Sequence, residues 1–189
     1  TTAGSHDAEG QAAAGERVDL ERGSLEAARS TYQQSVELFV ATLGDNHPLA
    51  GHPLAGLGDV SLREGQPRDA IESYTRALML WESSYGADHT YLLAILPGLG
   101  RSHAMIGHPD EARRFLARAV GIAERHDRRG VELAAALEAL GDLTAQEGGR
   151  EQARGLYERA AKVFDAAAGT DSQKGARAAL RAGELAAEL

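Results

Sequence analysis

The sequence predicts an all-α fold, a right-handed α-solenoid of about nine helices in antiparallel pairs, and three observations predict it. One set of small and aromatic residues recurs at fixed offsets in successive segments about 42 residues long. The apolar residues are mostly Ala and Leu, which favour helices over strands. No run of alternating β-branched residues indicates a strand. Together these observations predict one continuous array over residues 1–189.

The repeated pattern holds small or aromatic residues at five positions, numbered 0, 7, 12, 16 and 19. Its four copies are Glu16, Gly23, Ala28, Tyr32 and Ser35; Gly58, Gly65, Ala70, Tyr74 and Ala77; Gly100, Gly107, Ala112, Leu116 and Ala119; and Gly141, Gly148, Ala153, Tyr157 and Ala160. Small side chains at fixed spacing let two helices touch closely, and a larger side chain between them fills the remaining gap. The pattern therefore predicts stacked helical hairpins.

Each repeat is expected to hold two helices, A and B, joined by a turn at position 7. The repeats are expected at about residues 7–46, 47–88, 89–128 and 129–170, followed by a capping helix at 172–189. In the first repeat the turn falls at Gly23 and Ser24, which separate helices at about 7–22 and 24–43. The capping helix is an A helix without a B partner, because Gly183 follows Gly141 by 42 residues.

Two prolines disturb the expected A helices. Pro53 lies one turn inside the second A helix, which either starts again there or is kinked. Pro97 lies in the middle of the third A helix, at 89–106, and predicts a kink. Pro67 instead suits the first turn of a B helix, where its missing N–H costs nothing.

The spacing resembles that of the tetratricopeptide repeat family. The period is longer than the 34 residues of that motif, and the junctions at 43–48 and 85–90 resemble those of kinesin-light-chain repeats. The resemblance implies a non-enzymatic scaffold that binds a peptide or protein segment in a concave groove lined by the A helices. The alternative is a regulatory or sensor module of a larger bacterial signalling protein, such as a kinase, a nucleotide-dependent switch or a transcription regulator.

The resemblance also implies which residues face the groove. They follow the position-0 residue of each A helix or precede it by one turn: Asp59, Leu62, Arg63, Arg101, Ala104, Met105, Glu138, Asp142 and Gln146. Mixed charge over an apolar floor suits an extended peptide. The Lys and Asn clamp of chaperone-binding members is absent, because its matching positions are Ala55, Asp59, Pro97 and Arg101. The paired Asn residues of kinesin light chains are also replaced.

Composition argues against several functional classes. Asp and Glu number 28 against 20 Lys and Arg, which disfavours nucleic-acid binding despite the basic run at 125–129. Cysteine is absent, so thiol chemistry and Cys-based zinc sites are not expected. No apolar run approaches the roughly 18 residues of a membrane span. We therefore expect a cytoplasmic protein that binds neither nucleic acid nor membrane.

Seven histidines raise the question of metal binding or catalysis. His47 and His89 occupy equivalent junctions, which favours a turn hydrogen bond over a metal site. There is no HExxH motif and no Gly-x-Ser-x-Gly elbow. The Gly-Leu-Gly runs at 56–58 and 98–100 lie inside predicted helices and are interpreted as packing contacts. No catalytic residue, metal ligand or cofactor is therefore expected.

Three further features have a structural interpretation. Trp81, near the end of the second B helix, is expected to pack against a neighbouring repeat, with an exposed ligand-stacking site as the alternative. The B-helix arginines Arg76, Arg118 and Arg159 are expected on the outer face, with Glu72 and Glu158 as nearby partners. The last helix carries Leu180, Leu185 and Leu189, which makes it a candidate for capping or for self-association.

Overall fold

The computed structural model describes residues 3–126, 130–166 and 172–187, with side chains described for 23–126, 130–166 and 177–185. The described residues form eight α-helices and two short 3-10 helices, and none of them lies in a strand. In chain order the elements are α1 (Ala3–Leu43), η1 (Pro48–Ala50), α2 (Gly51–Arg63), α3 (Pro67–Tyr85), η2 (Thr90–Ala94), α4 (Leu96–Met105), α5 (Pro109–Arg125), α6 (Val131–Gln146), α7 (Arg150–Ala166) and α8 (Ser172–Ala187). The all-α prediction is confirmed.

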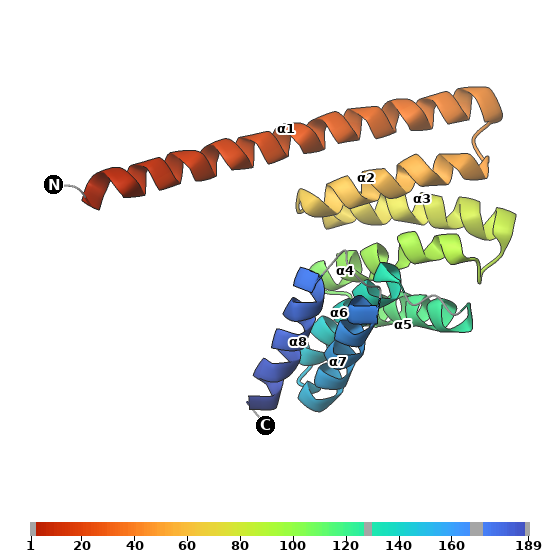
Figure 1. Cartoon of the computed structure of the whole chain (residues 1–189). Helices are drawn as coiled ribbons and strands as arrows, with labels where there is room; N and C mark the ends of the chain where they lie inside the picture. The colour runs from red at the N-terminus through yellow and green to blue at the C-terminus, as the bar shows by residue number, and fades with distance from the viewer. Residues whose placement is uncertain (1–2, 127–129, 167–171, 188–189) are drawn as a thin grey trace.

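The helices form a stack in chain order (Figure 1). Helix α2 packs on α3, α4 on α5 and α6 on α7, and each of these pairs contacts the next. Helix α1 lies at one end of the stack, against α2, and α8 lies at the other end, against α7. In the described part of the chain, no helix combines the length and apolar character that a bilayer-spanning segment needs.

The residues at positions 0 and 16 explain how closely the two helices of a pair approach. A β-carbon on Gly58 would lie 2.4 Å from the ring of Tyr74, and one on Gly141 would lie 2.8 Å from the ring of Tyr157. The ring of Tyr74 also meets Gly98 of the following A helix, where a β-carbon would lie 2.5 Å away. The large side chain is therefore clamped between two A helices whose glycines make room for it.

Positions 12 and 19 are the close contacts that the sequence predicts. In the three pairs from α2 to α7 all six alanines are fully buried: Ala70, Ala77, Ala112, Ala119, Ala153 and Ala160. The turn within each pair falls on a glycine with a positive φ, at 71° for Gly65, 79° for Gly107 and 85° for Gly148. Only glycine adopts that backbone conformation without strain, so position 7 fixes where the A helix ends.

The first repeat differs from the prediction. Instead of two helices with a turn at Gly23, the structure has the single helix α1, which accounts for eight α-helices where about nine are expected. Its second half packs on α2, and the ring of Tyr32 meets Gly56. Ala28, Tyr32 and Ser35 are nevertheless partly exposed, although their counterparts in later pairs are buried.

The two disruptive prolines divide their segments rather than bend a continuous helix. Before Pro53, the 3-10 helix η1 gives way to α2 at Gly51, so this proline lies in the first turn of a new helix. Before Pro97, η2 ends at Ala94 and α4 begins at Leu96. The predicted kinked helix over 89–106 is therefore wrong. Because a new helix begins directly before Pro97, the missing N–H of this proline falls in the first turn, where no intrahelical hydrogen bond is lost.

The repeat junctions are closed by histidine caps, as the sequence predicts. Nδ1 of His47 accepts a hydrogen bond from the backbone N–H of Leu49 at 3.3 Å, and Nδ1 of His89 accepts one from Tyr91 at 3.2 Å. Trp81 lies beside the first junction, 1% exposed, and its indole N–H donates to the carbonyl of Pro48 at 3.0 Å. Its ring centre lies 5.6 Å from that of Tyr91 in the next repeat, so the predicted packing against a neighbouring repeat is confirmed.

Two of the three B-helix arginines pair with the preceding B helix rather than with their own. Arg118 lies 2.5 Å from Glu82, and Arg159 lies 2.5 Å from Glu124. Arg76 makes no ion pair or hydrogen bond within the described residues. The predicted same-helix partners were Glu72 and Glu158.

The start of the basic run at 125–129 is also neutralised within the chain. The Arg125 guanidinium bonds both carboxylate oxygens of Asp88 and holds the pKa of that exposed carboxyl below its usual range. The ring of His126 contacts the same residue. Residues 127–129 lie outside the described part.

Candidate functional site

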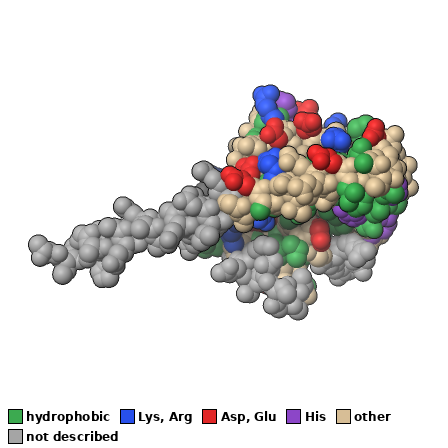
Figure 2. All heavy atoms as spheres, turned by 90° about the horizontal axis from the view of Figure 1, so that it is seen from above, with side chains coloured by type: hydrophobic (Ala, Val, Ile, Leu, Met, Phe, Trp, Pro, Cys, Tyr) green, Lys and Arg blue, Asp and Glu red, His purple; other side chains and the backbone are tan. Residues whose placement is uncertain are grey.

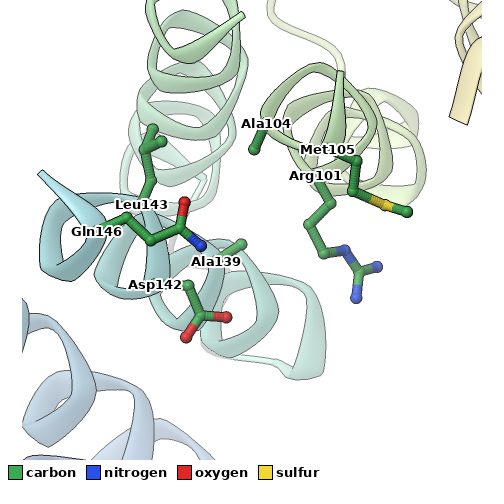
Figure 3. A pocket seen from close by; sticks show the side chains of 7 residues that line it. All are labelled: Arg101, Ala104, Met105, Ala139, Asp142, Leu143 and Gln146. Atoms are coloured by element: carbon green, nitrogen blue, oxygen red, sulfur yellow. The ribbon is translucent and has the colours of Figure 1, made fainter. Parts of the chain in front are cut away.

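A pocket of about 250 Å³ lies between the A helices α4 and α6. Its lining residues are Arg101, Ala104, Met105, Ala139, Asp142, Leu143 and Gln146. Figure 3 shows Ala104 and Gln146 directed into the space between the two helices, whereas Met105 extends away from α6. Five of the nine predicted groove residues are thus brought together, namely Arg101, Ala104, Met105, Asp142 and Gln146.

The pocket combines an apolar lining with a polar rim. Ala139 and Leu143 supply buried apolar surface from α6. Met105 on α4 is 56% exposed, although a methionine usually gains by burial. An exposed, flexible thioether beside an apolar lining can adapt to an apolar side chain of a ligand. The rim residues Arg101 and Gln146 can bond polar groups.

Asp142 is already engaged within the protein. The hydroxyl of Tyr157 donates to its Oδ1 at 2.7 Å, and the guanidinium of Arg181 on α8 also bonds this oxygen. That guanidinium lies 5.7 Å from the centre of the Tyr157 ring. Burial, followed by the bond to Asp142, raises the pKa of Tyr157 above its ordinary range. The carboxylate therefore links α6 to α7 and α8 through Oδ1.

Arg101 is a rim charge to which the described residues supply no partner. It occupies the position directly after Gly100, where α2 has Asp59 and α6 has Asp142. In those pairs the carboxylate accepts a tyrosine hydroxyl, but α5 has Leu116 at position 16, which has no hydroxyl to bond. Within the described residues Arg101 makes no hydrogen bond and no ion pair. It is therefore available to bind an anionic group.

Three predicted residues lie on α2 and do not line the pocket. Asp59 accepts the hydroxyl of Tyr74 at 2.6 Å. Leu62 is partly buried and packs against the core. Arg63 is exposed and makes no ion pair or hydrogen bond within the described residues. Burial raises the pKa of Tyr74 most strongly, while Arg101 and Arg63 oppose that increase, so both positive charges act near this hydroxyl.

Glu138, the remaining predicted residue, is engaged by the last helix. It accepts Arg177 at 3.0 Å and lies 3.6 Å from Arg181. The sequence interpretation did not include Arg181, nor did it include Ala139 and Leu143 in the pocket. The signal for the last two was available, because they lie two residues before and after Gly141, on the same A helix as Asp142.

Other surfaces offer less to a ligand. A wide hollow of about 530 Å³ involves α5, α6 and α7, but its arginines Arg113 and Arg159 are already paired with glutamates. The rings of His103 and His108 lie 5.9 Å apart, and burial lowers the pKa of His103. No group of three or more His, Asp or Glu side chains in the described ranges is placed to hold a metal ion.

Comparisons with known proteins agree with this architecture. Among solved structures, a kinesin light chain protein of Podospora anserina with nearly identical TPR-like repeats has a TM-score of 0.67 at 19% identity, with 91% of this chain and 83% of that chain covered. BtubC (BKLC) of P. vanneervenii has a TM-score of 0.65 at 19% identity, covering 89% and 76%. MamA has a TM-score of 0.54 at 20% identity, covering 89% and 92%. These likenesses concern the fold alone.

No curated protein matches the chain in sequence. A family model described as tetratricopeptide repeat matches residues 17–80 and 62–125. These two matches together span more than half of the chain. The chain therefore belongs to the tetratricopeptide repeat family.

Proposed function

We propose that this chain is a non-enzymatic scaffold that binds an extended peptide segment of a partner protein along its A helices, with the α4–α6 pocket as the central subsite. Tetratricopeptide repeats are protein-interaction scaffolds, and the finer assignment rests on this pocket. The observation that carries it is Arg101, an unpaired charge on the rim of an apolar pocket. Among the side chains that the structure describes, none forms an ion pair or hydrogen bond with this guanidinium.

The chemistry of the pocket indicates which peptide would fit. An apolar side chain can fill the space between Met105 and Leu143, where burial contributes roughly 25 cal/mol per Å² of apolar area. An acidic side chain next to it can pair with Arg101, and Arg63 can extend that preference along the groove. Asp59, Glu138 and Asp142 would remain occupied by their own tyrosine or arginine partners. The proposed ligand is therefore an apolar residue flanked by acidic ones.

A regulatory or sensor role within a larger signalling protein is compatible with the same groove. The groove would then take a segment from another domain or from an upstream partner, and the same two arginines would select it. This alternative and the scaffold share one binding surface, so a single experiment tests the surface for both.

The test is selection of peptides from a random library against the chain, followed by affinity measurement by fluorescence anisotropy. We expect enriched peptides to contain an apolar residue beside Asp or Glu. Their affinity should fall at least about tenfold for the variant Arg63→Glu/Arg101→Glu, because each reversal replaces attraction with repulsion.

The matched control is Arg68→Glu/Arg76→Glu, which makes the same charge change on exposed residues of α3. This control should bind the selected peptides as the unmodified chain does. Equal loss in both variants would show that net charge, not the groove, controls binding. Enriched peptides that bind the groove variant normally would remove the proposed site.

A further inference from the structure

The two ends of the stack each leave one helix face without the partner that the repeat pattern provides elsewhere. The second half of α1 is a B helix by its pattern; it packs on the following A helix α2, but the preceding segment continues as the same helix and does not fold back on it as the A helix of its own repeat. Helix α8 is an A helix by its pattern; it packs on the preceding B helix α7, but within the described residues no B helix follows it to form a pair. The exposed faces of these two helices are therefore of complementary type.

Burial shows which residues make up these faces. Position 16 is 0–4% exposed in the pairs that contain both helices, as Tyr74, Leu116 and Tyr157, whereas Tyr32 is partly exposed. Ala28 and Ser35, at positions 12 and 19, are likewise partly exposed. At the other end, Gly183 at position 0 is exposed, and a β-carbon on it would meet no atom within 4 Å.

The side chains at the two ends fit the rule that the internal pairs follow. Where position 16 is a tyrosine, position 0 of its A helix is a glycine and the next residue is an aspartate that accepts the hydroxyl, as with Asp59 and Asp142. Helix α8 offers Gly183 followed by Glu184, which has no hydrogen-bond or ion-pair partner in the described part. Tyr32 would therefore find both the space and the acceptor that a tyrosine at this position requires.

The segment that precedes Tyr32 in its own chain does not satisfy this rule. At the corresponding places it carries Glu16 and Arg17. In the complete pairs with a tyrosine, a β-carbon at position 0 would lie only 2.4–2.8 Å from the ring. A glutamate there would collide with Tyr32, and an arginine would not accept its hydroxyl. The face of α1 is thus matched to α8 rather than to its own N-terminal segment.

We propose that copies of this chain associate head to tail, with α8 of one copy packed as the missing A helix on the Ala28–Tyr32–Ser35 face of α1 of the next. The contact is heterologous, so each copy keeps one free face of each type and the stack continues from copy to copy. The ring of Tyr32 would pack on Gly183, and its hydroxyl would donate to the carboxylate of Glu184.

The test uses two variants that each block one end, measured by sedimentation velocity on the chain 1–189. Gly183→Arg fills the glycine gap of α8, and Ser35→Arg places a long charged side chain on the α1 face. We expect the unmodified chain to form larger species as concentration rises from about 1 μM to about 1 mM. Each variant alone should remain a monomer, because a chain can grow only when both faces are available.

Mixing the two variants gives the decisive result. Ser35→Arg retains a free α8 and Gly183→Arg retains a free α1 face, so an equimolar mixture should form a dimer that grows no further. A symmetric contact between two copies of α8 would instead leave Ser35→Arg self-associating on its own, and the mixture would contain no dimer that joins the two variants. A monomeric unmodified chain across the whole concentration range, or a mixture that stays monomeric, would overturn the proposal.

Matched controls separate the contact from changes in folding. Gly155→Arg changes another helical glycine whose β-carbon would meet nothing within 4 Å. Thr42→Arg changes a hydroxyl on α1 that bonds the carbonyl four residues before it, as Ser35 does. Both controls should associate like the unmodified chain. Tyr32→Phe should weaken association about 2- to 10-fold, the equivalent of one lost hydrogen bond, while Tyr85→Phe should not.

Discussion

The α2–α3 and α4–α5 pairs follow the same pattern but carry opposite charges at the residue directly after position 0. In the first, Tyr74 fills the helix contact and its hydroxyl binds Asp59. In the second, Leu116 fills the contact, and Arg101 occupies the place of that aspartate with no partner in the described ranges. Because Leu116 has no hydroxyl, the residue that faces it is not needed as a hydrogen-bond acceptor within the pair. We propose that this difference converts a packing position into a binding position.

The A helix that follows each pair also differs, in the size of the residue that contacts position 16. The Tyr74 ring needs Gly98 on α4, where a β-carbon would lie 2.5 Å from it. The corresponding residue after Leu116 is Ala139 on α6, which packs in one cluster with that leucine. A smaller side chain at position 16 therefore permits a larger one on the following helix, and the apolar lining of the pocket results in part from that exchange.

The largest effect is expected where the two pairs are alike, at position 12. Ala112→Glu would place a carboxylate at a fully buried helix contact, and an unpaired buried charge costs about 3–5 kcal/mol. Circular dichroism should show a large fall in melting temperature. Ala117→Glu, an exposed alanine on the same helix, is the control and should change little. An unchanged melting temperature for Ala112→Glu would contradict the packing at this position.

A smaller effect should follow from making the α4–α5 pair resemble the α2–α3 pair. Leu116→Tyr would press a ring against the β-carbon of Ala139, and such overpacking costs about 1–3 kcal/mol. Adding Ala139→Gly should restore part of the loss, although this change alone costs about 1 kcal/mol in helix propensity. Urea unfolding of the two single variants and the double variant measures the coupling. Strictly additive losses would contradict the proposed exchange of volume.

The smallest effect concerns the tyrosine hydroxyls themselves. Burial and the bond to aspartate raise the folded-state pKa of Tyr74 and Tyr157 above the unfolded value of about 10. The protonated form thus favours folding, so this contribution is present below pH about 10 and is lost as pH rises further. Tyr74→Phe and Tyr157→Phe should each cost about 1 kcal/mol at neutral pH.

The measurement for these variants is the tyrosinate absorbance during an alkaline titration. The unmodified chain should show two tyrosines that ionise late, and each variant should lose one of them. Tyr85→Phe, which changes a ring 41% exposed, should keep both. Late ionisation that persists unchanged in both variants would show that other tyrosines are responsible.

The sequence predicts the internal pairs well because their packing is local and periodic. Gly65, Gly107 and Gly148 end the A helices as expected, and the alanines of positions 12 and 19 are buried. It fails in the first repeat, where Gly23 alone predicts a turn. A turn glycine permits a hairpin, but the contact at position 0 must also fit, and Glu16 stands there instead of glycine.

The candidate site is less predictable for a related reason. The periodic register brings Arg101 and Asp142 to one pocket, but it does not show which charges are already paired. Glu138 and Asp142 are engaged by Arg177 and Arg181, which lie almost 40 residues further along the chain. The partners of Arg118 and Arg159 are missed similarly, since they lie on the preceding B helix rather than one turn away.

The single tryptophan of the chain gives the molecule an internal reporter. Trp81 is buried beside Gly51, is bonded to the Pro48 carbonyl, and lies against the ring of Tyr91 in η2, so its fluorescence depends on the packing where η1, α2, α3 and η2 meet. In arrays whose units contact only their neighbours, different parts can unfold separately. Emission that changes before or after the helical signal would therefore locate which end of the stack opens first.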